Sequence, residues 1–103
     1  MSSQQKRYSV IVHDKAAQML YAHVQFVANV SIPAVRKLKN KLYEALTSLE
    51  TMPFRCPVYR THNTSAEYRQ LLTGRYKIIF AVSEENMTVS IRYFLDVRQK
   101  GEL

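Results

Sequence analysis

Two amphipathic helical patterns fill the first half of the chain, with almost no sequence between them. In residues 14–30, apolar side chains recur every three or four positions, which places them on one face of a helix. They are Ala16, Leu20, Val24 and Val27. Asp14 is the candidate cap of this helix. So short a connection to the next helix constrains the two to an antiparallel hairpin.

The second helical pattern begins at Ser31, a residue that caps helices well. Pro33 lies in the first turn, where its missing N–H costs little. Apolar residues then form one stripe: Val35, Leu38, Leu42, Ala45, Leu46 and Leu49. We expect Met52-Pro53 to end the helix, because proline cannot continue one.

Strand patterns surround this hairpin in the sequence. Residues 8–12 are rich in β-branched side chains and predict a short strand. After a loop at 53–66, three more strands are expected, at 67–72, 76–82 and 87–94. Gly74 lies in the turn between the first two of these, at a position that tolerates positive φ.

The alternation of side chains assigns faces to these strands. The face toward the helices takes Tyr76, Ile78, Phe80 and Val82, and in the same manner Val89, Ile91 and Tyr93. Lys77, Ile79 and Ala81 then face away. We therefore predict one α+β domain, residues 1–103, of order β-α-α-β-β-β. It is an antiparallel sheet with the helical hairpin on one face, and the open face is where function is expected.

The chain is strongly basic for its size. Fifteen Lys and Arg against eight Asp and Glu give a formal net charge of +7. Such a field attracts polyanions, so RNA, DNA, an anionic membrane surface and an acidic protein are the candidate partners. No apolar run approaches the roughly 20 residues that span a bilayer. Cys56 is a lone cysteine, which fits a reducing cytoplasm; we expect a cytoplasmic protein without a membrane partner.

Three segments carry a resemblance to a known family. Residues 68–80 (YRQLLTGRYKIIF) match an arginine-x-leucine, turn, tyrosine-basic-apolar pattern. Residues 48–53 (SLETMP) match a helix end in which a proline soon follows a leucine. Residues 89–98 (VSIRYFLDVR) match a last strand with a terminal basic residue. In this order and spacing, the chain resembles the RelE/ParE superfamily of toxins from bacterial toxin–antitoxin pairs.

The resemblance implies two activities on one fold. RelE-like members enter the ribosomal A site and cut mRNA without a metal or cofactor. ParE-like members inhibit DNA gyrase. Both are neutralised by an antitoxin that wraps the toxin. The main hypothesis is ribosome-dependent mRNA cleavage, with gyrase inhibition as the alternative and a non-toxic basic interaction domain as a third possibility.

The family's catalytic residues map incompletely onto this chain. Its central arginine falls on Lys77 and its later arginine on Arg98, while its paired lysines fall on Tyr68 and Gln70. We expect Lys77, Arg69 and Arg98 to converge on the open face, although each has an alternative role in solubility or ion pairing. His62 is the histidine nearest the site edge and a candidate for proton transfer.

Further contacts to RNA are predicted from charge and ring type. The candidates are Arg36, Lys37, Lys39, Lys41, Arg75 and Tyr68. The helix cations have a solvated helix face as their alternative. Tyr59 and Tyr93 are further candidates for stacking on a base. His23 is expected to be packed, and no two histidines have metal-ligand spacing. The wide apolar arc of the first helix predicts a groove for the antitoxin.

Overall fold

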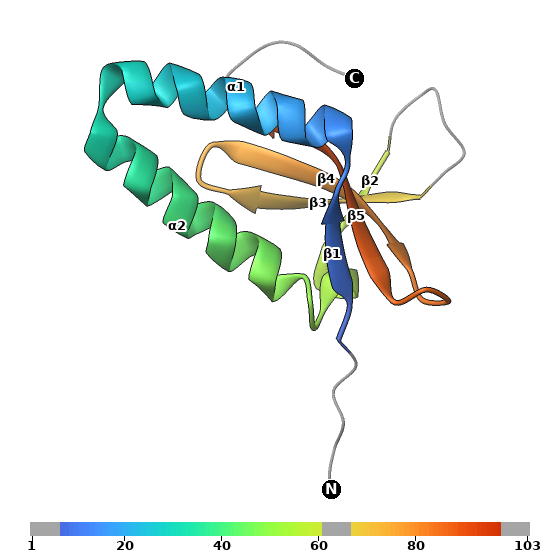
Figure 1. The fold of residues 1–103 in the computed structure, drawn as a ribbon. Helices are drawn as coiled ribbons and strands as arrows, with labels where there is room; N and C mark the ends of the chain where they lie inside the picture. Colours follow the sequence, from blue (N-terminus) through green and yellow to red (C-terminus); the bar gives the residue numbers. More distant parts are fainter. Residues whose placement is uncertain (1–6, 61–66, 98–103) are drawn as a thin grey trace, which may run out of the picture.

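The computed structural model describes residues 7–60 and 67–97. The elements are β1 (Ser9–Val12), α1 (Asp14–Val30), α2 (Ile32–Ser48), the 3₁₀ turn η1 (Pro53–Arg55), β2 (Val58–Tyr59), β3 (Tyr68–Thr73), β4 (Tyr76–Ser83) and β5 (Thr88–Asp96) (Figure 1). The predicted α+β class and the helical hairpin are confirmed. The two-residue strand β2 was not predicted; it lies in the segment interpreted as a loop.

The helix boundaries follow from local capping. The Ser31 hydroxyl accepts a hydrogen bond from the Ala34 amide at 3.2 Å, so the predicted cap of α2 is confirmed. The predicted cap of α1 is wrong, because His13 occupies the N-cap position and Asp14 lies in the first turn. At that position the negative Asp14 carboxylate still interacts favourably with the positive end of the helix dipole. Helix α2 ends at Ser48, before Met52-Pro53, and Pro53 starts η1.

The five strands form one mixed sheet in the order β1-β5-β4-β3-β2. The pairs β2–β3, β3–β4 and β4–β5 are antiparallel, as predicted for the meander. β1 adds to β5 in parallel, with Val10 opposite Val89 and Val12 opposite Ile91. This parallel pair is possible because the long connection through both helices and three strands lets β1 and β5 run the same way.

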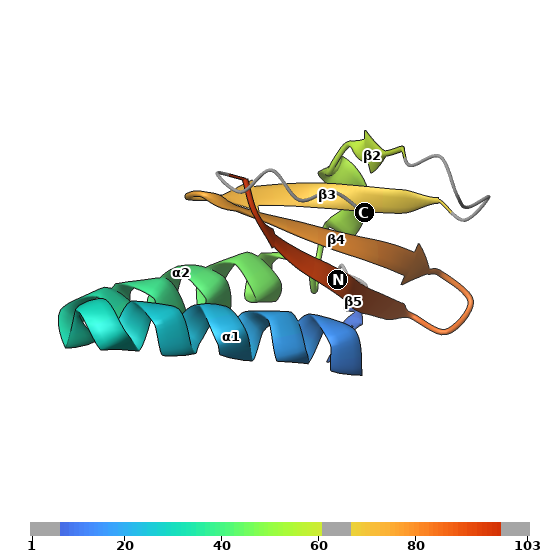
Figure 2. The same ribbon diagram turned by 90° about the horizontal axis from the view of Figure 1, so that it is seen from above.

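The helical hairpin packs on one face of this sheet (Figure 2). The core joins Leu38, Leu42 and Ala45 of α2, together with its C-cap Leu49, to Tyr76, Ile78, Phe80, Val89, Ile91 and Phe94 of the sheet. The predicted alternation on β4 is confirmed: Tyr76, Ile78 and Phe80 are buried in the core, and the partly buried Val82 packs against it. Ile79 is also fully buried, but it lies on the opposite face and is outside this cluster.

A β-bulge in β5 changes which side chains face the core. Ile79 pairs with Tyr93 while the next residue, Phe80, pairs with Ile91, so Arg92 is an extra residue in β5. An extra residue shifts the alternation by one position. Phe94 therefore packs in the core, and the predicted inward placement of Tyr93 is wrong. Tyr93 instead shares the outward face with Ile79.

Candidate nucleic-acid interface

The sheet face opposite the helices, here called the outer face, combines aromatic rings with a cation. By strand register it carries Tyr59, Tyr68, Gln70, Lys77, Ile79 and Tyr93. The Lys77 ammonium lies 5.2 Å from the centre of the Tyr59 ring. Lys77 belongs to β4 and Tyr59 to β2, and β3 lies between these two strands. The two side chains therefore meet above β3. A cation among rings suits a ligand that offers both phosphates and bases.

Lys77 is the one predicted basic catalytic residue that the structure places on the outer face. Its backbone position is opposite Leu95 of β5 and Leu72 of β3, so it is held within an interior strand. Arg98 and His62, the other predicted catalytic residues outside β3, lie outside the described residues. Their convergence with Lys77 remains a prediction.

Arg69 does not lie on the outer face, so the predicted placement of this residue is wrong. It pairs with Phe80, which faces the helices. Its guanidinium donates hydrogen bonds to the carbonyl oxygens of Cys56 at 2.6 Å and Phe54 at 3.4 Å, and stacks on the Phe54 ring at 5.0 Å. With only 17% of its side chain exposed, Arg69 anchors the η1 turn to the sheet rather than presenting its charge to a ligand.

Arg75, predicted to contact RNA from the β3–β4 turn, is engaged within the protein. Its guanidinium donates two hydrogen bonds to Asp96 Oδ2, at 2.6 and 3.1 Å. The Asp96 side chain is only 2% exposed, and the hydrogen bond raises the pKa of Arg75 further above its usual range. The Arg75 carbonyl also accepts from the Val97 amide. Arg75 thus closes the end of the β4–β5 pair.

The predicted basic residues of α2 are all exposed, but they belong to the helical layer. They are Arg36, Lys37, Lys39 and Lys41. The Lys41 side chain packs near Gly74 in the β3–β4 turn: a Cβ atom added at Gly74 would lie 3.7 Å from the Lys41 ammonium. The structure therefore does not bring these four together with Lys77. Tyr68, in contrast, lies on the outer face beside Tyr59, as its predicted role requires.

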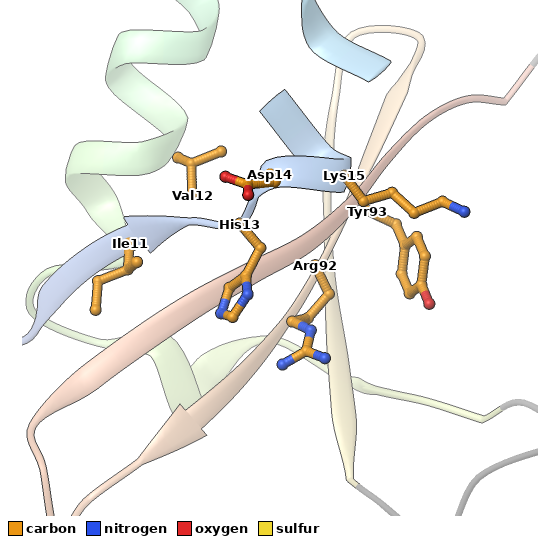
Figure 3. A pocket seen from close by; sticks show the side chains of 7 residues that line it. All are labelled: Ile11, Val12, His13, Asp14, Lys15, Arg92 and Tyr93. Atoms are coloured by element: carbon orange, nitrogen blue, oxygen red, sulfur yellow. The ribbon is translucent and has the colours of Figure 1, made fainter. Parts of the chain in front are cut away.

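A basic hollow that sequence reasoning missed lies where β1 passes into α1, beside the bulge (Figure 3). It has a volume of about 430 Å³, and His13, Lys15, Arg92 and Tyr93 are among its lining residues. In Figure 3 the side chains of His13 and Arg92 extend in the same direction, while Asp14 points the other way. The available signal was Arg92 itself, a charged residue inside the apolar run of the last strand.

Two titratable groups, the half-buried His23 and the buried Cys56, pack within the fold. The His23 ring packs edge-on against Tyr76 at 5.2 Å and Phe94 at 5.5 Å, which confirms its predicted packed role. Burial lowers the pKa of His23, against the opposing effect of the Asp96 charge. Burial likewise raises the pKa of the Cys56 thiol, so this cysteine is held as an unreactive thiol.

Residues 7–60 and 67–97 contain no group of three or more His, Cys, Asp or Glu side chains placed to hold a metal ion. Neither helix in this part of the chain is long and apolar enough to cross a bilayer.

Comparison with known proteins gives a match in structure and none in sequence. No protein-family model matches the chain, and no curated protein sequence does. The RelBE2 toxin–antitoxin complex of Mycobacterium tuberculosis matches with a TM-score of 0.58 at 17% identity, over 85% of this chain and 95% of the other. The archaeal RelE–RelB complex of Pyrococcus horikoshii matches with a TM-score of 0.57 at 17% identity, over 88% and 96%. The chain has the RelE fold.

The RelE fold gives the sequence mapping a geometric meaning. The family's paired lysines fall on Tyr68 and Gln70, and both of these residues lie on the outer face by register. Lys77, on which the sequence resemblance places the family's central arginine, lies on the same face. These three positions, all within the described part of the chain, therefore share one surface.

Proposed function

We propose that this protein is the toxin of a toxin–antitoxin pair and inhibits translation by cutting mRNA at the ribosome, without a metal. The observation that carries the proposal is the outer face of a RelE fold, where Lys77 lies over the Tyr59 ring and shares the face with Tyr68 and Tyr93. The net charge of +7 supports a polyanionic target.

The chemistry assigned to the outer face is phosphoryl transfer within the RNA chain. The 2′-oxygen attacks the adjacent phosphorus, a 2′,3′-cyclic phosphate forms, and the 5′-oxygen leaves with a proton. Negative charge grows on the phosphate oxygens during this step. A positioned ammonium such as that of Lys77 stabilises that charge, which is the largest contribution a site of this kind can make.

The outer face supplies one cation, Lys77, and several rings, but it lacks lysines at the two positions where the resemblance implies them. Tyr68 and Gln70 occupy the places where lysines are expected, and a glutamine side chain does not titrate. Loss of a positioned acid or base typically lowers a rate by about 10²- to 10⁴-fold. We therefore propose that cleavage requires the ribosome to orient the 2′-hydroxyl.

The partner proposed for the helical hairpin is a cognate antitoxin. Both structural neighbours are complexes with an antitoxin or with RelB. In this chain the hairpin exposes five large apolar side chains: Tyr21, Phe26, Val30, Ile32 and Tyr43. Exposed apolar surface of this kind usually marks a partner site. Co-expression with the protein encoded in the neighbouring reading frame is expected to give a stable complex burying more than ~1,000 Å².

The experiment that tests the proposed function is a primer-extension map of mRNA in a translating extract. Adding the protein is expected to create new ends in codon register, with a chelator present and only when ribosomes are present. Lys77→Met is expected to lose cleavage by about 10²- to 10³-fold. Arg7→Gln, a charge-matched change in an exposed ion pair with Glu50, is expected to cut as the wild type does.

Other outcomes of the same experiment identify the alternatives. An unchanged map together with gyrase-dependent DNA breaks would assign the chain a ParE-like activity. Normal growth on expression, with translation and replication both intact, would leave a basic interaction domain without toxicity. Either result overturns the proposal.

A further inference from the structure

The hollow beside the β5 bulge is formed by two segments that are far apart in the sequence. His13 and Lys15 come from the β1–α1 junction, and Arg92 and Tyr93 come from the middle of β5. The His13 amide donates to the Ile91 carbonyl at 3.0 Å, which fixes the junction against β5. The bulge at Arg92 supplies the extra residue that turns its side chain toward the junction (Figure 3).

The cations of the hollow are available to a ligand. Within residues 7–60 and 67–97, the side chains of Arg92 and Lys15 make no ion pair or hydrogen bond. Arg69 and Arg75, in contrast, are bonded to protein oxygen atoms. Asp14 is the one carboxylate that lines the hollow, and it points away from Arg92 in Figure 3. The hollow therefore favours an anion over a cation.

The groups present also specify what kind of anion fits. A guanidinium offers a planar fork of donors that matches phosphate oxygens. Tyr93 places an aromatic ring beside this fork, which suits a base attached to the phosphate. A volume of about 430 Å³ lies in the usual range for a site that holds a small ligand or one monomer of a longer one.

The position of the hollow connects it with Lys77. Lys77 is opposite Leu95 in the neighbouring strand, and Arg92 lies three residues before Leu95. Strand dimensions then separate Lys77 from Arg92 by roughly 11 Å. Tyr93, which belongs both to the outer face and to the hollow, lies between them. One extended strand of nucleic acid can contact both cations.

We propose that the hollow is a second subsite for single-stranded RNA, in which Arg92 and His13 hold a backbone phosphate and Tyr93 stacks on the adjoining base. This inference rests on the proposed function, because it extends the RNA path from Lys77 across β5. Arg92 is a positioning residue here: it holds the strand on the face without touching the phosphate that reacts.

The test measures binding by fluorescence anisotropy with a short, labelled, 2′-O-methylated oligouridylate, which cannot be cleaved. Arg92→Gln is expected to lower affinity by about tenfold or more, the effect of losing a charged hydrogen bond. It should also reduce the slope of log affinity against log salt by roughly 0.7, the contribution of one phosphate contact. Tyr93→Leu is expected to lower affinity by about fivefold without changing the salt slope. The charge-matched Arg7→Gln, in an exposed ion pair with Glu50, should stay within about twofold of the wild type.

The outcomes separate this inference from the proposed function. If Lys77→Met loses binding while Arg92→Gln binds with wild-type affinity and salt slope, the subsite is wrong and the proposed function stands. If Arg92 governs RNA binding but no mRNA is cut in the translating extract, the proposed function fails and the subsite stands. Equal competition by duplex DNA overturns the assignment to single-stranded RNA.

A second measurement covers the case in which Arg92→Gln does not fold, as judged by circular dichroism. Nuclear magnetic resonance titration of the wild-type protein with the same oligonucleotide is expected to shift the Arg92 Nε and Tyr93 ring signals before any signal of α2. Unchanged Arg92 and Tyr93 signals at saturation overturn the proposal.

Discussion

Arg69 and Lys77 are basic residues of the same β-hairpin, but the sheet turns them to opposite faces. The Arg69 guanidinium donates hydrogen bonds to the backbone carbonyls of Phe54 and Cys56. The Lys77 ammonium instead lies over the Tyr59 ring on the outer face. A sequence motif does not show which charged side chain will be hydrogen-bonded within the protein and which will face solvent. The strand register supplies this information, and of these two residues Lys77 remains a candidate for catalysis.

This difference gives a matched pair of variants. Arg69→Met is expected to lower the free energy of unfolding by about 2–3 kcal/mol, because two carbonyl groups lose a charged donor. Lys77→Met removes one partly exposed cation–π contact and should cost about 1 kcal/mol or less. Urea unfolding followed by circular dichroism measures both. A larger loss for Lys77→Met than for Arg69→Met would contradict the assignment of Arg69 to structure.

His23 predicts how stability depends on pH. Burial lowers its pKa in the folded state, with the Asp96 charge opposing this shift and the Arg75 charge adding to it. The unfolded chain therefore binds a proton more readily, so protonation favours unfolding. The free energy of unfolding should fall as pH drops below about 6.5. In His23→Gln this loss should be smaller, as urea titrations between neutral and mildly acidic pH would reveal; an unchanged pH profile would exclude His23 as the cause.

At the scale of elements, the bulge in β5 determines which residues reach the core. The alternation seen in the sequence placed Tyr93 inward, and one extra residue reversed that placement from Arg92 onward. The long elements with strong periodicity, α1, α2, β4 and most of β3 and β5, were predictable. The two-residue β2, the parallel pairing of β1 and the hollow at the bulge were not, because each depends on contacts between distant segments.

Deleting Arg92 is expected to remove the bulge and restore regular alternation. Val89, Ile91 and Phe94 would keep their inward positions, because Tyr93 would follow Ile91 directly as its outward neighbour, so the free energy of unfolding should fall by only about 1 kcal/mol. Deletion of Ser90 is the contrast: it would turn Ile91 outward and Arg92 inward, and should cost more than about 3 kcal/mol. Thermal unfolding of the two deletion variants provides the comparison, and equal melting temperatures would contradict the assignment of Arg92 as the extra residue.

Gly74 sets the β3–β4 hairpin by its backbone conformation. Its φ is +59°, and the space for a Cβ is ordinary, with Lys41 at 3.7 Å or more. Gly74→Ala is therefore expected to cost about 1–2 kcal/mol through backbone strain alone. Gly74→Asn should cost less, because asparagine tolerates the left-handed region better than alanine does. Chemical denaturation of both variants checks this order, and an equal cost would point to a steric cause instead.

For the whole molecule, the excess of positive charge predicts a strong dependence of RNA binding on salt. Each phosphate neutralised on a single strand contributes about −0.7 to the slope of log affinity against log salt. With one phosphate contact at Lys77 and one in the hollow, the slope for the free protein should be about −1.4 or steeper. Anisotropy titrations over a range of potassium chloride concentrations measure it. A slope near zero would mean that RNA, if bound at all, is not held through its phosphates.

The sheet order also governs when the outer face is completed during synthesis of the chain. β5, the last of the described strands in chain order, lies between β1 and β4, so β1 has no neighbouring strand until residues 88–96 exist. Pairing between segments as distant in sequence as β1 and β5 forms late and slowly, because the intervening loop must close first. A nascent chain that stops after β4 therefore lacks both the bulge and the complete outer face. Residues 88–96 must leave the ribosome before either can form.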